Sequence, residues 1–144
     1  MANGAGMREI LLHGGADEAF DRSVLFAKRM AESFGARLHV LYTVEVPLSA
    51  GWTAEMSAER LPEVHDAMAT EAQERLSRLI PIEDQDRLGV IFVIRTGPAS
   101  EELVRYTTDS NIDLAIVQVR GGQDDTSLAH ALLERGRCAV LVLR

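Results

Sequence analysis

The sequence has little cysteine, no excess of basic residues and no long apolar run, and each shortage excludes a class of protein. A single cysteine, Cys138, excludes an internal disulfide and any Cys-x-x-Cys metal or redox motif. The formal net charge of −7 is the wrong sign for general affinity to nucleic acid or to an anionic membrane. No apolar run approaches the roughly 20 residues of a membrane span, and the first residues lack the pattern of a secretory leader. We therefore expect a cytoplasmic protein without a nucleic-acid or membrane partner.

Several motifs with known chemistry are also missing. The four histidines form neither a His-Glu-x-x-His pattern nor an i, i+4 pair, so a metal site is not expected. No serine stands in a Gly-x-Ser-x-Gly turn, and no glycine-rich turn carries the lysine of a P-loop. We expect no catalytic residue and no enzyme activity, with slow nucleotide hydrolysis through His13 as an open alternative.

The length favours one domain with a substantial core. A chain of 144 residues buries roughly 68–70% of its unfolded surface when it folds as a single unit. We expect a short disordered tail over residues 1–7 and one domain over residues 8–144.

Apolar runs alternate with amphipathic stretches along this domain. The runs predict strands over residues 9–13, 36–46, 89–97, 112–119 and 138–144. The periodic stretches predict helices over residues 17–34, 63–80, 98–111 and 126–136. The first of these helices has one apolar face made of Phe20, Val24, Ala27, Ala31 and Phe34. Residues 47–62, which contain Trp52, are expected to form a long connection or lid.

This alternation predicts the α/β class. Strands with nearly continuous apolar runs belong to parallel sheets covered on both faces, so we expect a single doubly wound, three-layer sandwich. Its binding cleft would lie beyond the carboxyl ends of the first and fourth strands. Gly14 and Gly15 stand at the first of these ends, and the stretch "VQVRGGQDDTS", residues 117–127, at the second. A strand, a glycine pair and a helix together form an arrangement that often holds a phosphate.

Three stretches resemble the universal stress protein family. "LHVLYTVE", "IRTGPASEELVRYTTDSNIDLAIV" and "CAVLVLR" stand in that family's order and spacing, and the likeness covers nearly the whole chain. The resemblance implies an adenine-nucleotide α-hydrolase-like fold with five parallel strands in the order 3-2-1-4-5 and two helices on each face. It also implies that some members bind ATP or AMP, that others bind no nucleotide, and that dimers pair their last strands.

The chain departs from the pattern of the nucleotide-binding members of that family. They carry an acidic residue just after the first strand, where Gly15 stands here. After the fourth strand they carry a glycine, two residues, a second glycine, nine residues, and then Gly followed by Ser or Thr. Gln118 replaces the first glycine and Gly121 keeps the second, but only four residues separate Gly121 from Thr126 and Ser127.

The shortened loop also carries two carboxylates. Asp125 is suited to cap the following helix with its own side chain, and Asp124 adds a second anion to the same turn. A carboxylate about 4 Å from a phosphate oxygen meets a repulsion of roughly 1 kcal/mol in water and about 4 kcal/mol at an effective dielectric constant of 20. Arg120 could counter this charge, but we expect it to pair with Asp124 or Asp125.

We therefore predict a universal stress protein-like stress-response or regulatory module that binds no ATP and no other cofactor. It would form a homodimer through the apolar strand from Cys138 to Leu143, whose backbone needs a partner if it is the edge of the sheet. The alternative is a protein that binds AMP, ATP or another small ligand in the residual cleft. The positions that would line this cleft are Gly14, Gly15, Thr43, Gly121 and Ser127.

Overall fold

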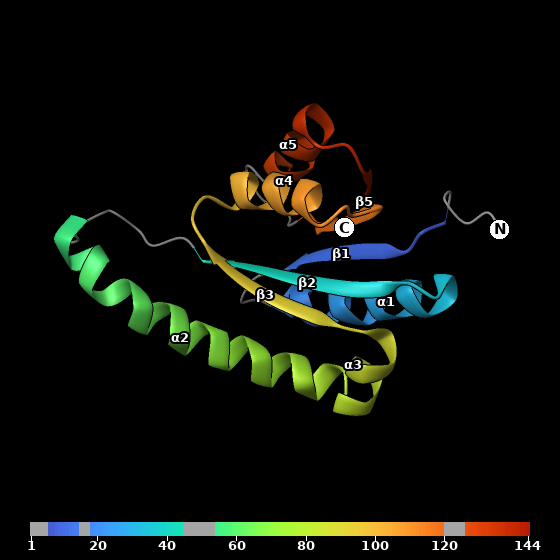
Figure 1. Ribbon diagram of the computed structural model, residues 1–144, viewed down its shortest axis with the longest axis horizontal. Helices are drawn as coiled ribbons and strands as arrows, with labels where there is room; N and C mark the ends of the chain where they lie inside the picture. Colours follow the sequence, from blue (N-terminus) through green and yellow to red (C-terminus); the bar gives the residue numbers. More distant parts are fainter. Residues whose placement is uncertain (1–5, 15–17, 45–53, 120–125) are drawn as a thin grey trace.

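The structure is a computed structural model that describes residues 6–14, 18–44, 54–119 and 126–144. It contains a five-stranded sheet in the order β3-β2-β1-β4-β5, and every pair of neighbouring strands is parallel (Figure 1). The strands are β1 (Glu9–Gly14), β2 (Arg37–Val44), β3 (Ile91–Thr96), β4 (Leu114–Gln118) and β5 (Ala139–Leu143). The predicted doubly wound α/β fold and its strand order are confirmed.

Helices cover both faces of this sheet. One face carries α1 (Glu18–Phe34), α2 (Ala54–Leu79) and α3 (Ile82–Leu88). The other carries α4 (Ala99–Asp109) and α5 (Ser127–Arg135) (Figure 1). No helix in the described part of the chain is long and apolar enough to cross a membrane. Of the predicted tail, only Gly6 and Met7 are described, and Met7 packs against the core on the α1 side.

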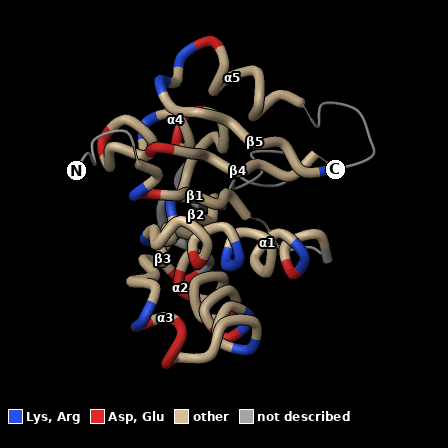
Figure 2. The backbone as a smooth tube through the Cα atoms, turned by 90° about the vertical axis from the view of Figure 1, so that its right-hand side faces the viewer, with Lys and Arg blue, Asp and Glu red and all other residues tan. Residues whose placement is uncertain are grey.

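Each strand sends alternate residues into two separate cores. Ile10 and Leu12 of β1 pack under α1 and α2, whereas Leu11 packs under α4 and α5, and all three are 0% exposed. A strand that is buried on both faces must be apolar at successive positions, which explains the run that the sequence shows. The middle of β1 and the whole of β4 accordingly contain no charged residue, and many of the charged residues lie on the helices (Figure 2).

The second helix is longer than the sequence analysis predicted. It begins at Ala54, nine residues before the predicted start at Glu63, and Pro62 lies inside it. Proline removes one backbone hydrogen bond, but the stretch "AEMSAERL" before it consists mostly of strong helix formers that support the earlier turns. The prediction of a connection is therefore wrong for residues 54–62. The remainder of that connection, with Trp52, lies outside the described residues.

Two smaller predictions also fail. The sequence analysis predicted no helix between Pro81 and Gly89, where α3 forms, because seven residues are too few to show a helical stripe. Phe34 was assigned to the buried face of α1 but is 52% exposed. It is the last residue of the helix, and the chain turns away immediately after it at Gly35, whose φ is +63°.

A hydrogen-bonded polar network lies at the amino end of the sheet. The ring of His39 is buried, with Nε2 2.8 Å from Glu9 Oε1 and Nδ1 2.7 Å from Tyr106 Oη. Arg37 Nε donates a second hydrogen bond of 2.8 Å to the same Glu9 oxygen. The network therefore joins β1, β2 and α4.

Asp113 aligns three strands at the same end. Its Oδ2 accepts hydrogen bonds from the backbone N–H groups of Arg8 and Glu9 at 2.9 and 2.8 Å. Its own N–H donates to the carbonyl of Glu9, and its carbonyl accepts from the N–H of Ala139 at 3.1 Å. The residue before β4 thus fixes the starts of β1 and β5 as well.

We predict that Glu9 makes stability depend on pH. Burial by itself raises the pKa of Glu9, but hydrogen bonds from His39 and Arg37 outweigh it and hold the pKa below its ordinary value. A carboxylate with a lowered folded pKa stabilises the protein above its unfolded pKa, and this contribution is lost as the pH falls through the folded pKa. Glu9→Gln should therefore lower the free energy of unfolding by about 1–2 kcal/mol at pH 7.

Urea denaturation across a pH series measures this effect. The gap between wild type and Glu9→Gln should narrow as the pH falls below about 4.3, the ordinary carboxyl value. Glu71→Gln is the matched control, because Glu71 is exposed on α2. A gap that is equally large at low pH, or no larger than that of Glu71→Gln, would contradict the prediction.

Candidate functional site

The candidate site lies at the carboxyl ends of β1, β2 and β4. The chain runs outward from β1 to β2 and β3 and then returns to β4 on the other side of β1, so the strand order reverses between β1 and β4. Open α/β sheets bind ligands in the crevice outside the strand ends at such a reversal. The described polar side chains in this region are His13 of β1, Thr43 of β2, Gln118 of β4 and Ser127 of α5.

The structure describes three of the five predicted cleft positions. Gly14 is buried at the end of β1, Thr43 is half-buried near the end of β2, and Ser127 is exposed as the first residue of α5. Gly15 and Gly121 lie outside the described residues. The same is true of Arg120, Asp124 and Asp125, so the loop predicted after β4 has no described geometry.

His13 and Thr43 meet on the side of the sheet that α4 and α5 cover. His13 Nε2 lies 2.7 Å from Thr43 Oγ1. The register of the parallel pair sets His13 beside Leu41, so Thr43 is the next residue of β2 on the same face. This pair brings an imidazole and a hydroxyl to the mouth of the predicted cleft.

On the α1 side, an aromatic ring fills the space beside the end of β1. A Cβ atom at Gly14 would lie 2.3 Å from the ring of Phe20, so only glycine fits at this position. The Phe20 ring contacts Tyr42 edge to face, with the centroids 6.3 Å apart. Arg75 lies 5.8 Å over Phe20 and forms an ion pair of 2.8 Å with Asp21. The packing of the Phe20 ring therefore accounts for a glycine at position 14 without any ligand.

Gln118 links three elements at the end of β4. Ser23 Oγ of α1 donates a hydrogen bond that is shared between Gln118 Oε1, at 2.5 Å, and the carbonyl of Ala19, at 2.9 Å. Gln118 Nε2 donates to the carbonyls of Leu143 in β5, at 3.3 Å, and of Val119, at 3.2 Å. Both ends of the side chain are thus engaged within the protein.

The sequence analysis identified Gln118 as a lost glycine but missed these bonds. A signal was present in α1, where Ser23 is a polar residue on the apolar face between Phe20 and Val24. Its side chain is only 1% exposed. A buried hydroxyl needs a hydrogen-bond partner, and the neighbouring strand can supply one.

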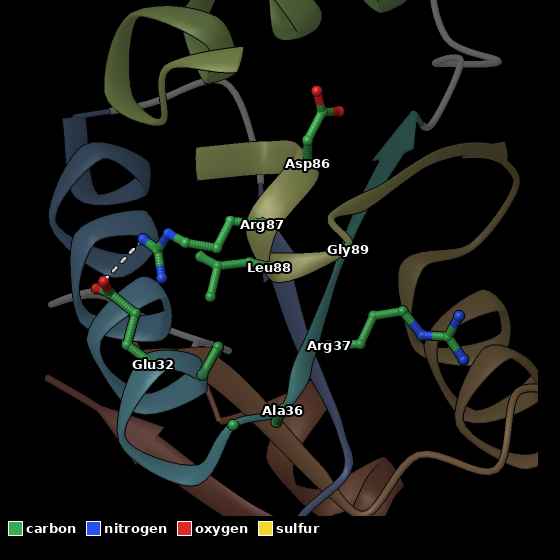
Figure 3. Close-up of a pocket in the computed structure, with 9 residues that line it drawn as sticks. Glu32, Ala36, Arg37, Asp86, Arg87, Leu88 and Gly89 are labelled. Atoms are coloured by element: carbon green, nitrogen blue, oxygen red, sulfur yellow. Dashed lines mark hydrogen bonds and ion pairs between the residues drawn. The ribbon is translucent and has the colours of Figure 1, made fainter. Parts of the chain in front are cut away.

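A second hollow lies at the opposite end of the sheet, between the end of α1, the start of β2 and α3 (Figure 3). It has a volume of about 370 Å³ and is lined by Glu32, Arg37 and Arg87 among others. Each of these charges has a partner: Arg87 pairs with Glu32 at 3.0 Å, and Arg37 pairs with Glu9 at 2.8 Å. Both guanidinium groups therefore already pair with a carboxylate, which makes them poor binding groups for an anionic ligand in this hollow.

The described residues form no cluster typical of metal binding, and their cysteine is partly shielded. No three His, Cys, Asp or Glu side chains among them come close enough to hold a metal ion. Cys138 is half-buried against the α4/α5 core. Burial raises the pKa of its thiol, which reduces the thiolate needed for nucleophilic attack.

Comparison with known proteins supplies a family. The sequence profile of the Universal stress protein family matches residues 7–144. The universal stress protein UspA from Lactobacillus plantarum is 21% identical to this chain, with a TM-score of 0.77, over 96% of this chain and 99% of that chain. No curated protein sequence matches the chain significantly.

Two further solved structures have a similar fold. A universal stress protein family member from Burkholderia pseudomallei is 21% identical, with a TM-score of 0.62, over 99% of this chain and 98% of that one. The universal stress protein from Archaeoglobus fulgidus in complex with dAMP is 15% identical, with a TM-score of 0.56, over 96% and 98%. At these identities the structures show the fold alone, whereas the family profile spans nearly the whole sequence. The chain therefore belongs to the universal stress protein family.

Proposed function

We propose that this chain is a cytoplasmic stress-response or regulatory module that does not bind ATP and acts as a homodimer. The observation that carries the first part is the side chain of Gln118. It stands where nucleotide-binding members of the family carry the first glycine of their loop. Its two polar ends are bonded to α1 and β5 instead.

Replacing glycine by glutamine at this position changes what a phosphate would meet. A glycine lets a ligand approach the backbone closely, and its N–H remains available to an anion. Here a phosphate would have to displace the Gln118 side chain and break its bonds to Ser23 and Leu143. Ser23 would keep its bond to the carbonyl of Ala19, so the cost is that of the hydrogen bonds that Gln118 loses, about 0.5–1.5 kcal/mol each.

The sequence of the following loop supports the same proposal. The four residues "GQDD" replace the nine of the nucleotide-binding members, so fewer backbone N–H groups are available to surround a phosphate. Asp124 and Asp125 add two negative charges to the same short loop. A triphosphate carries the most charge of the family's ligands, so ATP is the nucleotide that these features oppose most.

A second candidate function is binding of AMP or another small ligand in the residual cleft. The Archaeoglobus fulgidus protein was solved in complex with dAMP, a nucleoside monophosphate. In this chain, Thr43 lies near the end of β2 and Ser127 begins α5, and a ligand with one phosphate would meet less repulsion than ATP. The open alternative of hydrolysis through His13 would need the same cleft.

Isothermal titration calorimetry with ATP and with AMP separates the two candidates. We predict that ATP binds with a Kd above about 1 mM, because Gln118 and the acidic loop oppose its phosphates. Submillimolar affinity for ATP would contradict the main proposal. Submillimolar affinity for AMP without affinity for ATP would favour the second candidate.

A matched pair of threonine variants locates any binding that is found. Thr43→Val removes the hydroxyl near the cleft while keeping the shape of the side chain. Thr70→Val makes the same change on the exposed surface of α2, far along the chain from the cleft. Binding in the cleft should weaken in Thr43→Val and remain unchanged in Thr70→Val.

The homodimer proposal rests on the position and character of β5. This strand pairs with β4 on one side and is the last strand of the sheet order. Its five residues are Ala-Val-Leu-Val-Leu, without the charge or proline that usually protects an exposed edge. The side chain of Val142 is 41% exposed. Pairing with a second copy across a two-fold axis would complete the hydrogen bonds of this edge.

We predict that Val142→Lys shifts the protein from dimer to monomer, because a lysine on each edge would bring two positive charges together at the two-fold contact. Light scattering coupled to size exclusion at micromolar concentration measures the mass. Ile82→Lys is the matched control, because Ile82 is also exposed, at 59%. It belongs to α3, which packs on the face of the sheet opposite to α5. A monomeric wild type, or an unchanged mass of Val142→Lys, would disprove this interface.

A further inference from the structure

The second edge of the sheet, β3, borders a groove that the proposed function does not use. β3 pairs with β2, and no other described strand lies beyond it. The helix α2 runs beside β3 (Figure 1). Between these two elements is a hollow of about 420 Å³. It is lined by Phe92 and Ile94 of the strand and by Ala69, Thr70, Gln73 and Glu74 of the helix.

The hollow is apolar at its floor because α2 covers β3 incompletely. Ala72 and Leu76 carry the helix onto the sheet and are 3% and 0% exposed. On the neighbouring strip of the helix surface the residues are small or polar, beginning with Ala69 and Thr70. Phe92 and Ile94 are therefore only partly buried, although both pack against the adjacent cores.

The rim of the groove on α2 is acidic. At 3.6 residues per turn, Asp66, Thr70 and Glu74 lie on one side of the helix, and Asp66 and Glu74 are both exposed. Of the basic residues between positions 62 and 79, Arg75 is held by Asp21 of α1 at 2.8 Å, and Arg78 belongs to the last turn. The ring of His65 lies 3.9 Å from the carboxylate of Asp66 and is a cation only when it is protonated. Charged positions of both signs along α2 are visible in Figure 2.

We propose that this groove binds an extended segment of a partner protein in which an apolar residue is flanked, two positions away on each side, by Lys or Arg. The segment would pair with the outer edge of β3 through main-chain hydrogen bonds, so that every second side chain faces α2. Its apolar side chain would contact Phe92 and Ile94, and its two basic side chains would reach Glu74 and Asp66.

The spacing of the acidic residues matches such a segment. Asp66 and Glu74 are eight residues apart on α2, which corresponds to about 12 Å along the helix axis. In an extended strand, residues four positions apart are separated by about 13 Å. A Lys-x-Val-x-Lys sequence therefore places its two charges at the separation of the two carboxylates while its valine lies over the hollow.

The charge of the groove favours a basic partner over a second copy of the chain. The chain has a formal net charge of −7, so a basic segment is attracted to it from a distance. Two copies that met at this groove would also bring the acidic sides of two α2 helices together. The other edge strand, β5, carries no charged residue. The two edges of the sheet therefore favour different binding partners.

Fluorescence anisotropy with a labelled Thr-Lys-Thr-Val-Thr-Lys-Thr peptide tests the proposal. Wild type should bind this peptide, with an affinity that falls as salt is added. Glu74→Lys should weaken binding by about fivefold or more, because it replaces an attraction by a repulsion. Glu71→Lys is the matched control: it makes the same charge change at an exposed position of the same helix that does not line the groove, and should change binding less than twofold.

Two peptide variants and a test of whether the protein variant is folded complete the experiment. Replacing both lysines of the peptide by glutamate should abolish binding, and replacing its valine by glycine should weaken it severalfold. Circular dichroism checks that Glu74→Lys is folded; if it is not, Glu74→Gln replaces it, with an expected weakening of about threefold.

Three results would overturn the proposal. The first is no binding of the lysine peptide to wild type at about 1 mM, a limit that still detects weak recognition. The second is equal weakening by Glu71→Lys and Glu74→Lys, which would mean that only overall charge matters. The third is a dimer that persists in Val142→Lys but dissociates in Ala69→Arg, which would assign the groove to a second copy of the chain.

Discussion

The central strands of the sheet are covered by helices on both faces, and this double burial decides where a polar side chain can stand. The middle of β1 is Ile-Leu-Leu with no exposed surface, so polar groups occur toward the strand ends. At the amino end, Glu9 and His39 hydrogen bond with each other and hold β1 against β2. At the carboxyl end, His13 bonds with Thr43, and Gln118 bonds with its neighbours. One end therefore stabilises the sheet, and the other carries the polar side chains of the candidate site.

Gln118 connects the two parts of the proposed function. Its amide reaches the carbonyl of Leu143, the last residue of β5, which also accepts a hydrogen bond of 2.7 Å from the N–H of Val119. The same side chain accepts from Ser23 of α1. The side chain that stands at the family's first loop glycine thus also fastens the edge strand that we propose for the dimer. In the proposed function, the bonds of the Gln118 side chain would therefore both oppose ATP binding and order the edge strand of the dimer.

Local patterns in the sequence predict most of the fold and less of the site. Strands and helices with a repeating apolar face are visible in one short window, which is why β1 and α1 were predicted correctly, whereas the strand order was implied by the family resemblance. The start of α2 was missed because Pro62 suggests a break that the surrounding helix formers overcome. The bonds of Gln118 were missed because Ser23 and Leu143 are 95 and 25 residues away along the chain. Contacts of this kind depend on the register of the finished sheet.

The side-chain amide of Gln118 reports most directly whether this corner of the protein is closed to ATP. Its NH₂ signal in a ¹H–¹⁵N spectrum can be assigned by its loss in Gln118→Leu, and the backbone amide of Gly14 reports on the neighbouring end of β1. If Gln118 stays bonded to Ser23 and Leu143, millimolar ATP should leave both signals unchanged. Saturable shifts of both signals on addition of ATP would contradict the proposal that the protein does not bind this nucleotide.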